Sequence, residues 1–111
     1  MGITKNIYYT GEKDSARAFA EEMEASGIAD RIRAEEGNIR YEYYLPVNNS
    51  KTVLLIDSWK DQKALDIHHA SPMMKEIAAL REKYDLHMSV TQYTEIKNDG
   101  AEKYMAINEN W

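Results

Sequence analysis

A run of four apolar residues, Val53-Leu54-Leu55-Ile56, lies within residues 52–59, which have the composition of a β-strand. Because successive side chains of a strand point to opposite faces of the sheet, this run places apolar groups on both faces. A strand with two apolar faces needs a cover on each side, which a one-layer hairpin in water does not provide. In a chain of 111 residues, one cover can come from the protein's own helices, and only the C-terminal tail or a second copy remains for the other. We infer that a second copy is the simplest cover.

The predicted elements follow the order strand, helix, strand, strand, helix pair, strand. This order is the split βαβ pattern of a ferredoxin-like α+β sandwich, with the helices on one face of the sheet. Residues 1–96 are expected to form this single domain, and residues 97–111, which are mostly polar, are expected to be an extension outside it. The predicted strands cover residues 3–10, 39–45, 52–59 and 86–96, and the helices cover residues 15–25, 28–34, 61–69 and 72–83.

Composition and charge exclude several classes of function. Fourteen Lys+Arg against nineteen Asp+Glu give a formal net charge of −5, so nucleic-acid and anionic-membrane binding are not expected. The sequence has no cysteine, which excludes disulfides, thiolate nucleophiles and thiolate metal sites. It shows neither a signal-peptide core nor an apolar stretch of membrane-spanning length, so a cytoplasmic protein is expected. Gly-rich phosphate loops and the Gly-x-Ser-x-Gly elbow of serine hydrolases are also missing from the sequence.

The pair His68-His69, at the end of the predicted short helix, is the most notable local feature of the chain. Histidine titrates near neutral pH, so it can act as a general acid or base with little tuning. Neighbouring helical residues point about 100° apart, so at most one of the pair faces a given pocket. A two-histidine metal site on a helix needs i, i+4 spacing, which the pair lacks, and we expect no metal. The alternative is that both histidines simply meet free carbonyls at the helix end.

Aromatic and polar residues on the predicted strands are candidates for a pocket lining. Trp59 and Asp57 share one strand face nine to eleven residues before His68, although a core tryptophan with an acidic neighbour would give the same pattern. The acidic pair Glu35-Glu36 is interpreted as a solvated turn. Further candidates on the other strands, each also explicable as a packing or edge residue, are Asn6, Tyr8 and Tyr41.

Three segments together resemble the antibiotic biosynthesis monooxygenase (ABM) family. Residues 35–42, Glu-Glu-Gly-Asn-Ile-Arg-Tyr-Glu, resemble the family's Glu-x-Gly-x-x-x-Tyr entry to the second strand. Residues 57–65, beginning Asp-Ser-Trp, resemble its acidic-x-Trp motif with the charged turn and short helix that follow. Residues 68–74 resemble its His-x-x-[Ser/Thr]-Pro segment. The resemblance spans about residues 3–96, with the motifs in the family's order.

The resemblance implies a homodimeric α+β barrel in which two ferredoxin-like sheets pack face to face. It also implies an enzyme that oxidises a small quinol- or anthrone-like aromatic substrate with O₂ and needs no cofactor. In such chemistry the substrate anion supplies the electrons, and the protein supplies a base, a dry pocket and hydrogen-bond donors. His68 matches the family's histidine and is the candidate base. The residues implied for the substrate pocket are Trp59, Asn6, Tyr8, Tyr41, His69 and Asp57.

The family also contains haem-degrading monooxygenases and isomerases. The functional Asn, Trp and His of the haem degraders align with Tyr8, His68 and Ala78, so haem cleavage is disfavoured. A non-oxidative isomerase of a small hydroxycarbonyl compound would need a base in the same pocket and stays open as an alternative. A non-catalytic, ligand-binding dimer is the third reading. For residues 97–111, an arm that packs on the partner and a loosely ordered terminus both stay open.

Overall fold

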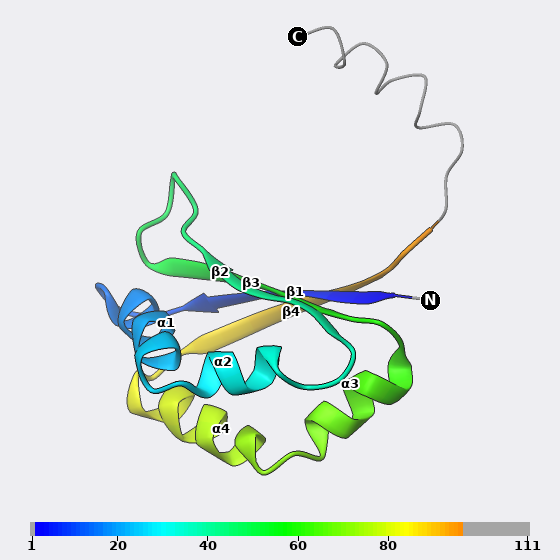
Figure 1. Cartoon of the computed structure of the whole chain (residues 1–111). Coiled ribbons are helices and arrows are strands. Elements are labelled where there is room, and N and C mark those ends of the chain that lie inside the picture. The colour runs from blue at the N-terminus through cyan, green and yellow to red at the C-terminus, as the bar shows by residue number, and fades with distance from the viewer. Residues whose placement is uncertain (1, 97–111) are drawn as a thin grey trace, which may run out of the picture.

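A computed structural model describes residues 2–96 of the chain, and Figure 1 shows its arrangement. Four strands form one antiparallel sheet in the order β2-β3-β1-β4. This is the ferredoxin-like α+β fold predicted from the order of elements. The elements are β1 (Ile3–Thr10), α1 (Ser15–Ala25), α2 (Ile28–Arg33), β2 (Asn38–Tyr44), β3 (Thr52–Trp59), α3 (Gln62–His69), α4 (Met73–Lys83) and β4 (His87–Thr94).

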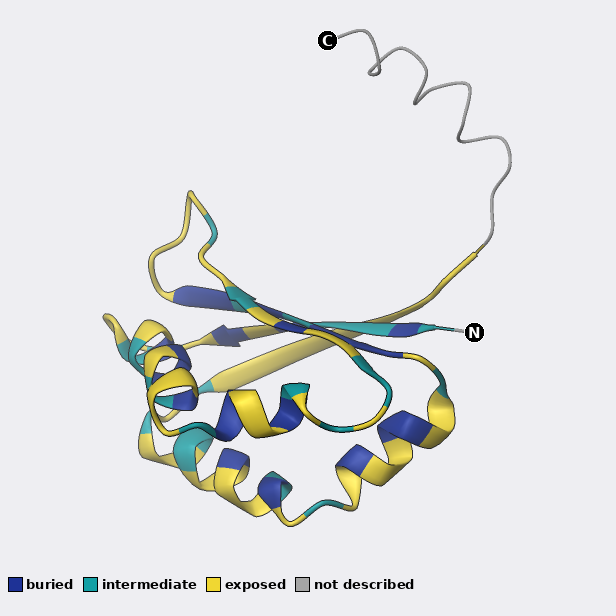
Figure 2. Cartoon of the chain, in the orientation of Figure 1, coloured by how far each residue is buried: buried dark blue, intermediate teal, exposed yellow. Residues whose placement is uncertain are grey.

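All four helices cover one face of the sheet, and the core lies between these two layers (Figures 1 and 2). Each helix buries a stripe of apolar residues at helical spacing, as Phe19 and Met23 of α1 illustrate. Gly27 separates α1 from α2, because its left-handed conformation (φ 84°) ends the first helix and starts the second at an angle. The interruption predicted at Ser26-Gly27 is therefore found. Val53 and Leu55 of β3 complete the core from the sheet side.

The opposite face of the sheet carries no helix among the described residues (Figure 1). On β3, Leu54 and Ile56 point to this face and are only partly buried. Tyr8 of β1 is paired with Leu54 and is 40% exposed, and Tyr93 of β4 is 51% exposed. A second copy of the chain over this apolar face stays a prediction, since the structure is of one chain. The predicted extension, residues 97–111, lies outside the described residues.

Of the helices in the described part, none is long and apolar enough to cross a membrane.

Candidate functional site

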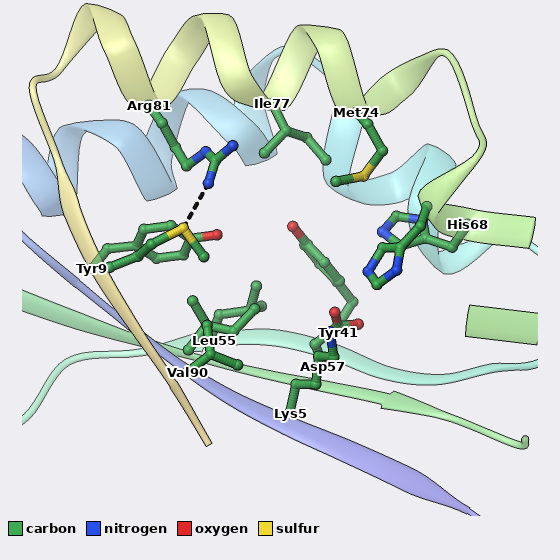
Figure 3. Close-up of a pocket in the computed structure, with 13 residues that line it drawn as sticks. Lys5, Tyr9, Tyr41, Leu55, Asp57, His68, Met74, Ile77, Arg81 and Val90 are labelled. Carbon is green, nitrogen blue, oxygen red and sulfur yellow. Dashed lines mark hydrogen bonds between the residues drawn. The ribbon is translucent and has the colours of Figure 1, made fainter. Parts of the chain in front are cut away.

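A cavity of about 100 Å³ lies between the sheet and helices α3 and α4 (Figure 3). Its floor comes from alternate residues of the strands, which all point to the helix side of the sheet, and its roof comes from α4. Most of the lining is apolar, with a few polar groups set among it, as is usual for a small-molecule site. The lining residues are Lys5, Ile7, Tyr9, Tyr41, Leu55, Asp57, His68, His69, Met74, Ile77, Arg81, Met88 and Val90.

His68 is held in one orientation at this cavity. It is 3% exposed, and its Nδ1 lies 2.7 Å from Glu35 Oε2. The imidazole also stacks on Trp59, with the ring centroids 4.6 Å apart and the planes at 26°. Because a carboxylate can only accept, the hydrogen bond runs from Nδ1–H to Glu35, and the neutral form of His68 then has its lone pair on Nε2. No hydrogen bond within residues 2–96 uses Nε2, so this atom is available to a ligand.

Local helix geometry explains why His68 rather than His69 is enclosed. The side chain of Asp61 caps α3 by accepting a hydrogen bond from the Ala64 amide at 2.8 Å, which fixes where the helix begins. Ala64 and His68 are then four residues apart and lie on the same buried face. His69 points about one hundred degrees away and is exposed, although it still reaches the cavity rim. Burial, together with the nearby charges of Lys5 and His68, lowers the pKa of His69.

Asp57 is a buried carboxyl in the same cavity. It lies on β3, is 4% exposed, and accepts a hydrogen bond from Trp59 Nε1 at 2.7 Å. Burial raises the pKa of Asp57 to about 6, and the Trp59 hydrogen bond and the charge on His68 offset part of that effect. A carboxyl with a pKa this close to neutral can exchange a proton with a substrate, so it is a second candidate acid or base.

Tyrosine hydroxyls supply neutral hydrogen-bond donors to the cavity. Tyr41 and Tyr43 hydroxyl oxygens are 3.1 Å apart, and their rings meet edge to face. Burial raises the pKa of Tyr41, and it raises the pKa of Tyr9 to about 12. Both groups are therefore neutral at physiological pH, and such hydroxyls can donate to a substrate anion.

The structure brings four of the predicted site residues to the cavity wall: His68, His69, Asp57 and Tyr41. Trp59 lies directly behind His68 and shapes the site through stacking. The predicted roles of these residues in binding or catalysis stay predictions.

Asn6 and Tyr8 do not lie at this cavity, in contrast to their predicted placement. Along β1 the side chains alternate, and it is Lys5, Ile7 and Tyr9 that face the helices. Asn6 and Tyr8 therefore belong to the opposite face of the sheet. The signal was present in the sequence, because Ile3, Ile7 and Tyr9 form the more apolar set of the strand.

Glu35 was predicted to be solvated, but its side chain is only 17% exposed and contacts His68. The two residues are 33 positions apart in the chain, so only the tertiary fold places them together. Lys5, Tyr9 and Arg81 are further cavity residues that the sequence analysis did not select. Among residues 2–96, no group of three or more His, Asp or Glu side chains is arranged to hold a metal ion.

Known proteins with similar sequences and structures place this geometry in a family. "Putative monooxygenase YcnE" of Bacillus subtilis is 35% identical over 46 residues, which are 41% of this chain and 48% of that protein. The match thus covers only about half of that relative. A crystal structure described as a putative antibiotic biosynthesis monooxygenase from Deinococcus radiodurans superposes with a TM-score of 0.75 at 15% identity, covering 86% of this chain and 94% of that one.

A second solved structure has the same fold. SnoaB of Streptomyces nogalater, described as a cofactor-independent oxygenase, superposes with a TM-score of 0.71 at 16% identity, covering 88% of this chain and 96% of that one. At these identities the solved structures establish the fold alone. The sequence model of the antibiotic biosynthesis monooxygenase family matches residues 2–80, and the chain therefore belongs to that family.

Proposed function

We propose that this protein is a cofactor-independent monooxygenase that oxidises a small, electron-rich aromatic compound of the quinol type with O₂. The observation that carries the proposal is His68, a buried imidazole whose Nδ1 is held by Glu35 and whose Nε2 is available at an apolar cavity. Membership of the family and the fold shared with a cofactor-independent oxygenase support the same chemistry.

The proposed reaction begins with removal of a phenolic proton by His68 Nε2. The resulting phenolate is electron-rich enough to transfer an electron to O₂, after which an oxygen–carbon bond forms on the ring. Loss of water from the hydroperoxide leaves a carbonyl, so one oxygen atom stays on the product and the other leaves as water. For hydroquinone the products are hydroxybenzoquinone and water. The substrate supplies all four electrons, and no other reductant is needed.

Protein groups around the cavity can stabilise the anion on which this chemistry depends. The hydroxyl of Tyr41 is a neutral donor, and Lys5 adds a positive charge on the sheet side. In a partly enclosed, mostly apolar site these interactions are stronger than in water. The volume of about 100 Å³ is smaller than an engineered cavity of about 150 Å³ that holds benzene, so a substrate with a single ring already requires the cavity to widen. A three-ring anthrone would require far more space, which favours the single-ring compound.

A homodimer is part of the proposal. Leu54 and Ile56 form a partly buried apolar strip on the helix-free face, and Tyr8 extends it on the neighbouring strand. An apolar patch of this kind on a soluble protein usually marks an interface. We expect sedimentation at micromolar concentration to give twice the 12.9 kDa mass of the chain, and a stable monomer would contradict this part of the proposal.

The function can be tested by measuring O₂ uptake with a panel of single-ring hydroquinones. Wild-type protein should consume one O₂ for each product formed, and His68→Gln should reduce kcat about 10²- to 10⁴-fold, the range typical of a general base. His87→Gln is a suitable control, because His87 is exposed on β4 and does not line the cavity. No O₂ uptake with any member of the panel, or an unchanged rate in His68→Gln, would contradict the proposal.

The isomerase alternative has one observation in its favour, which is that two proton-exchanging groups, His68 and Asp57, line the same cavity. Such a pair could move a proton between adjacent carbons without O₂. Anaerobic incubation with a hydroxyketone in D₂O separates the two functions, because an isomerase would incorporate deuterium. Binding without either reaction would identify the third reading, a ligand-binding dimer.

A further inference from the structure

Arg81 is a cavity residue that the proposed reaction does not use. It lies on α4, seven residues after Met74, so the two are about 10 Å apart along the helix on nearly the same face. Figure 3 shows Arg81 and Tyr9 toward one end of the cavity and His68 and Asp57 toward the other. The cavity therefore has two chemically distinct ends.

The guanidinium of Arg81 lacks a carboxylate partner within the described part of the chain. Its Nε is buried and donates to no acceptor among residues 2–96, and none of the ion pairs there includes Arg81. Its only side-chain hydrogen bond there runs from Nη1 to Met88 Sδ at 2.6 Å. A thioether is a weak acceptor, whereas a guanidinium stays charged and matches a carboxylate with two parallel hydrogen bonds. Arg81 is partly exposed as a residue, but its Nε–H is a buried donor without an acceptor, which is costly, and a bound carboxylate that accepts from Nε would relieve that cost.

Tyr9 supplies a second donor at the same end. Its side chain is buried against Phe19, and its hydroxyl has no hydrogen bond among residues 2–96. The positive charge of Arg81 is close enough to oppose the rise in the Tyr9 pKa that burial causes. Because that pKa still reaches about 12, the hydroxyl keeps its proton and can donate it to an anion.

The balance of charge in the lining points to the same kind of ligand. Two cations, Lys5 and Arg81, face the cavity, against one carboxyl, Asp57. The positive charge of Lys5 lowers the pKa of Asp57, so these two groups are near each other. Among the described lining residues, Arg81 is therefore the cation that has no carboxylate to balance its charge.

We propose that Arg81 and the Tyr9 hydroxyl form a subsite for a carboxylate, and that the substrate is a single-ring phenolic acid. The ring lies between the two ends, with its carboxylate on Arg81 and the hydroxyl to be deprotonated toward His68. This inference rests on the proposed function for the orientation of the ring. The carboxylate subsite itself is a binding property and can be measured without turnover.

The test compares two ligands that differ in one group. Binding of 2,5-dihydroxybenzoate and 2,5-dihydroxybenzamide is measured by calorimetry under anaerobic conditions, so that no oxidation occurs. A charge-assisted contact predicts that wild-type protein binds the acid at least about tenfold more tightly than the amide. Equal affinity, or no binding of the acid at millimolar concentration, would overturn the subsite.

Variants locate the preference within the cavity. Arg81→Met should remove the preference for the acid and leave the affinity for the amide within about twofold, since only the charged contact is lost. Arg81→Lys should keep part of the preference, and Tyr9→Phe should reduce it about three- to tenfold. The matched control is Arg17→Met, because Arg17 is an exposed residue of α1 outside the cavity. An acid preference that survives in a folded Arg81→Met protein would refute the assignment.

The two proposals fail in distinguishable ways. If the acid preference depends on Arg81 but no hydroquinone or dihydroxybenzoate consumes O₂, the subsite stands and the monooxygenase function is wrong. If uncharged hydroquinones are oxidised with a kcat that depends on His68, while the protein binds the acid no more tightly than the amide, the function stands and the subsite is wrong.

Discussion

The buried carboxyl of Asp57 should make the stability of this protein fall as the pH rises through the acidic range. Burial raises the pKa of Asp57 from 3.8 to about 6 in the folded state. Between these two values the folded protein binds more protons than the unfolded chain, so raising the pH favours unfolding. A pKa difference of about two, at about 1.4 kcal/mol per pKa unit, corresponds to about 3 kcal/mol that is lost by pH 7.

Asp57→Asn tests this directly, because the amide does not titrate and its oxygen can still accept from Trp59 Nε1. At pH 4 the variant and the wild type should have similar free energies of unfolding. At pH 8 the variant should be the more stable by up to about 3 kcal/mol. Urea unfolding at both pH values gives this difference, with the matched control Asp14→Asn, an exposed cap of α1 whose side chain makes no capping hydrogen bond. A difference between Asp57→Asn and wild type that does not change with pH would refute the reasoning.

Three further predictions concern orientation of the base, the turn before β2 and the sheet face. Glu35→Gln should lower kcat about 10- to 100-fold and change the pH profile of kcat, because the amide can stabilise the other His68 tautomer. The control Glu36→Gln, at the exposed neighbouring position, should leave kcat and its pH profile unchanged. Gly37→Ala should lower the free energy of unfolding, measured with urea, by about 1–3 kcal/mol more than Gly27→Ala does. Both glycines have positive φ, but only at Gly37 would an added Cβ meet Ala64, at 2.6 Å. Equal costs would show that backbone strain alone matters. Ile56→Lys should shift sedimentation toward monomer, because it places a charge on the proposed interface, and an unchanged dimer would place the interface elsewhere.

The sequence by itself determined the elements of this fold and their order. Period-two and period-3.6 patterns are local, and they predicted each strand and helix close to its observed bounds; β4, predicted over residues 86–96, spans His87–Thr94. Local signals also worked at helix ends, where Gly27 separates α1 from α2 and the Ser71 side chain accepts from the Met73 amide at the start of α4. The same local reasoning identified His68 and Asp57 as candidates, because residue type points to His68 at the end of a helix and strand phase places Asp57 on the same face as Trp59.

Only the tertiary structure decided which candidates meet. Glu35 reaches His68 because the turn before β2 packs against α3, a contact between residues 33 positions apart that no local pattern encodes. The phase of β1, which the sequence analysis did not assign, decides that Lys5, Ile7 and Tyr9 rather than Asn6 and Tyr8 face the cavity, since a strand sends alternate side chains to opposite sides. Arg81 drew no attention as one charge on a helix, and it became a candidate ligand contact only once its Nε was found buried at the cavity. Burial is a property of what surrounds a residue, and the chain supplies those surroundings only when it folds.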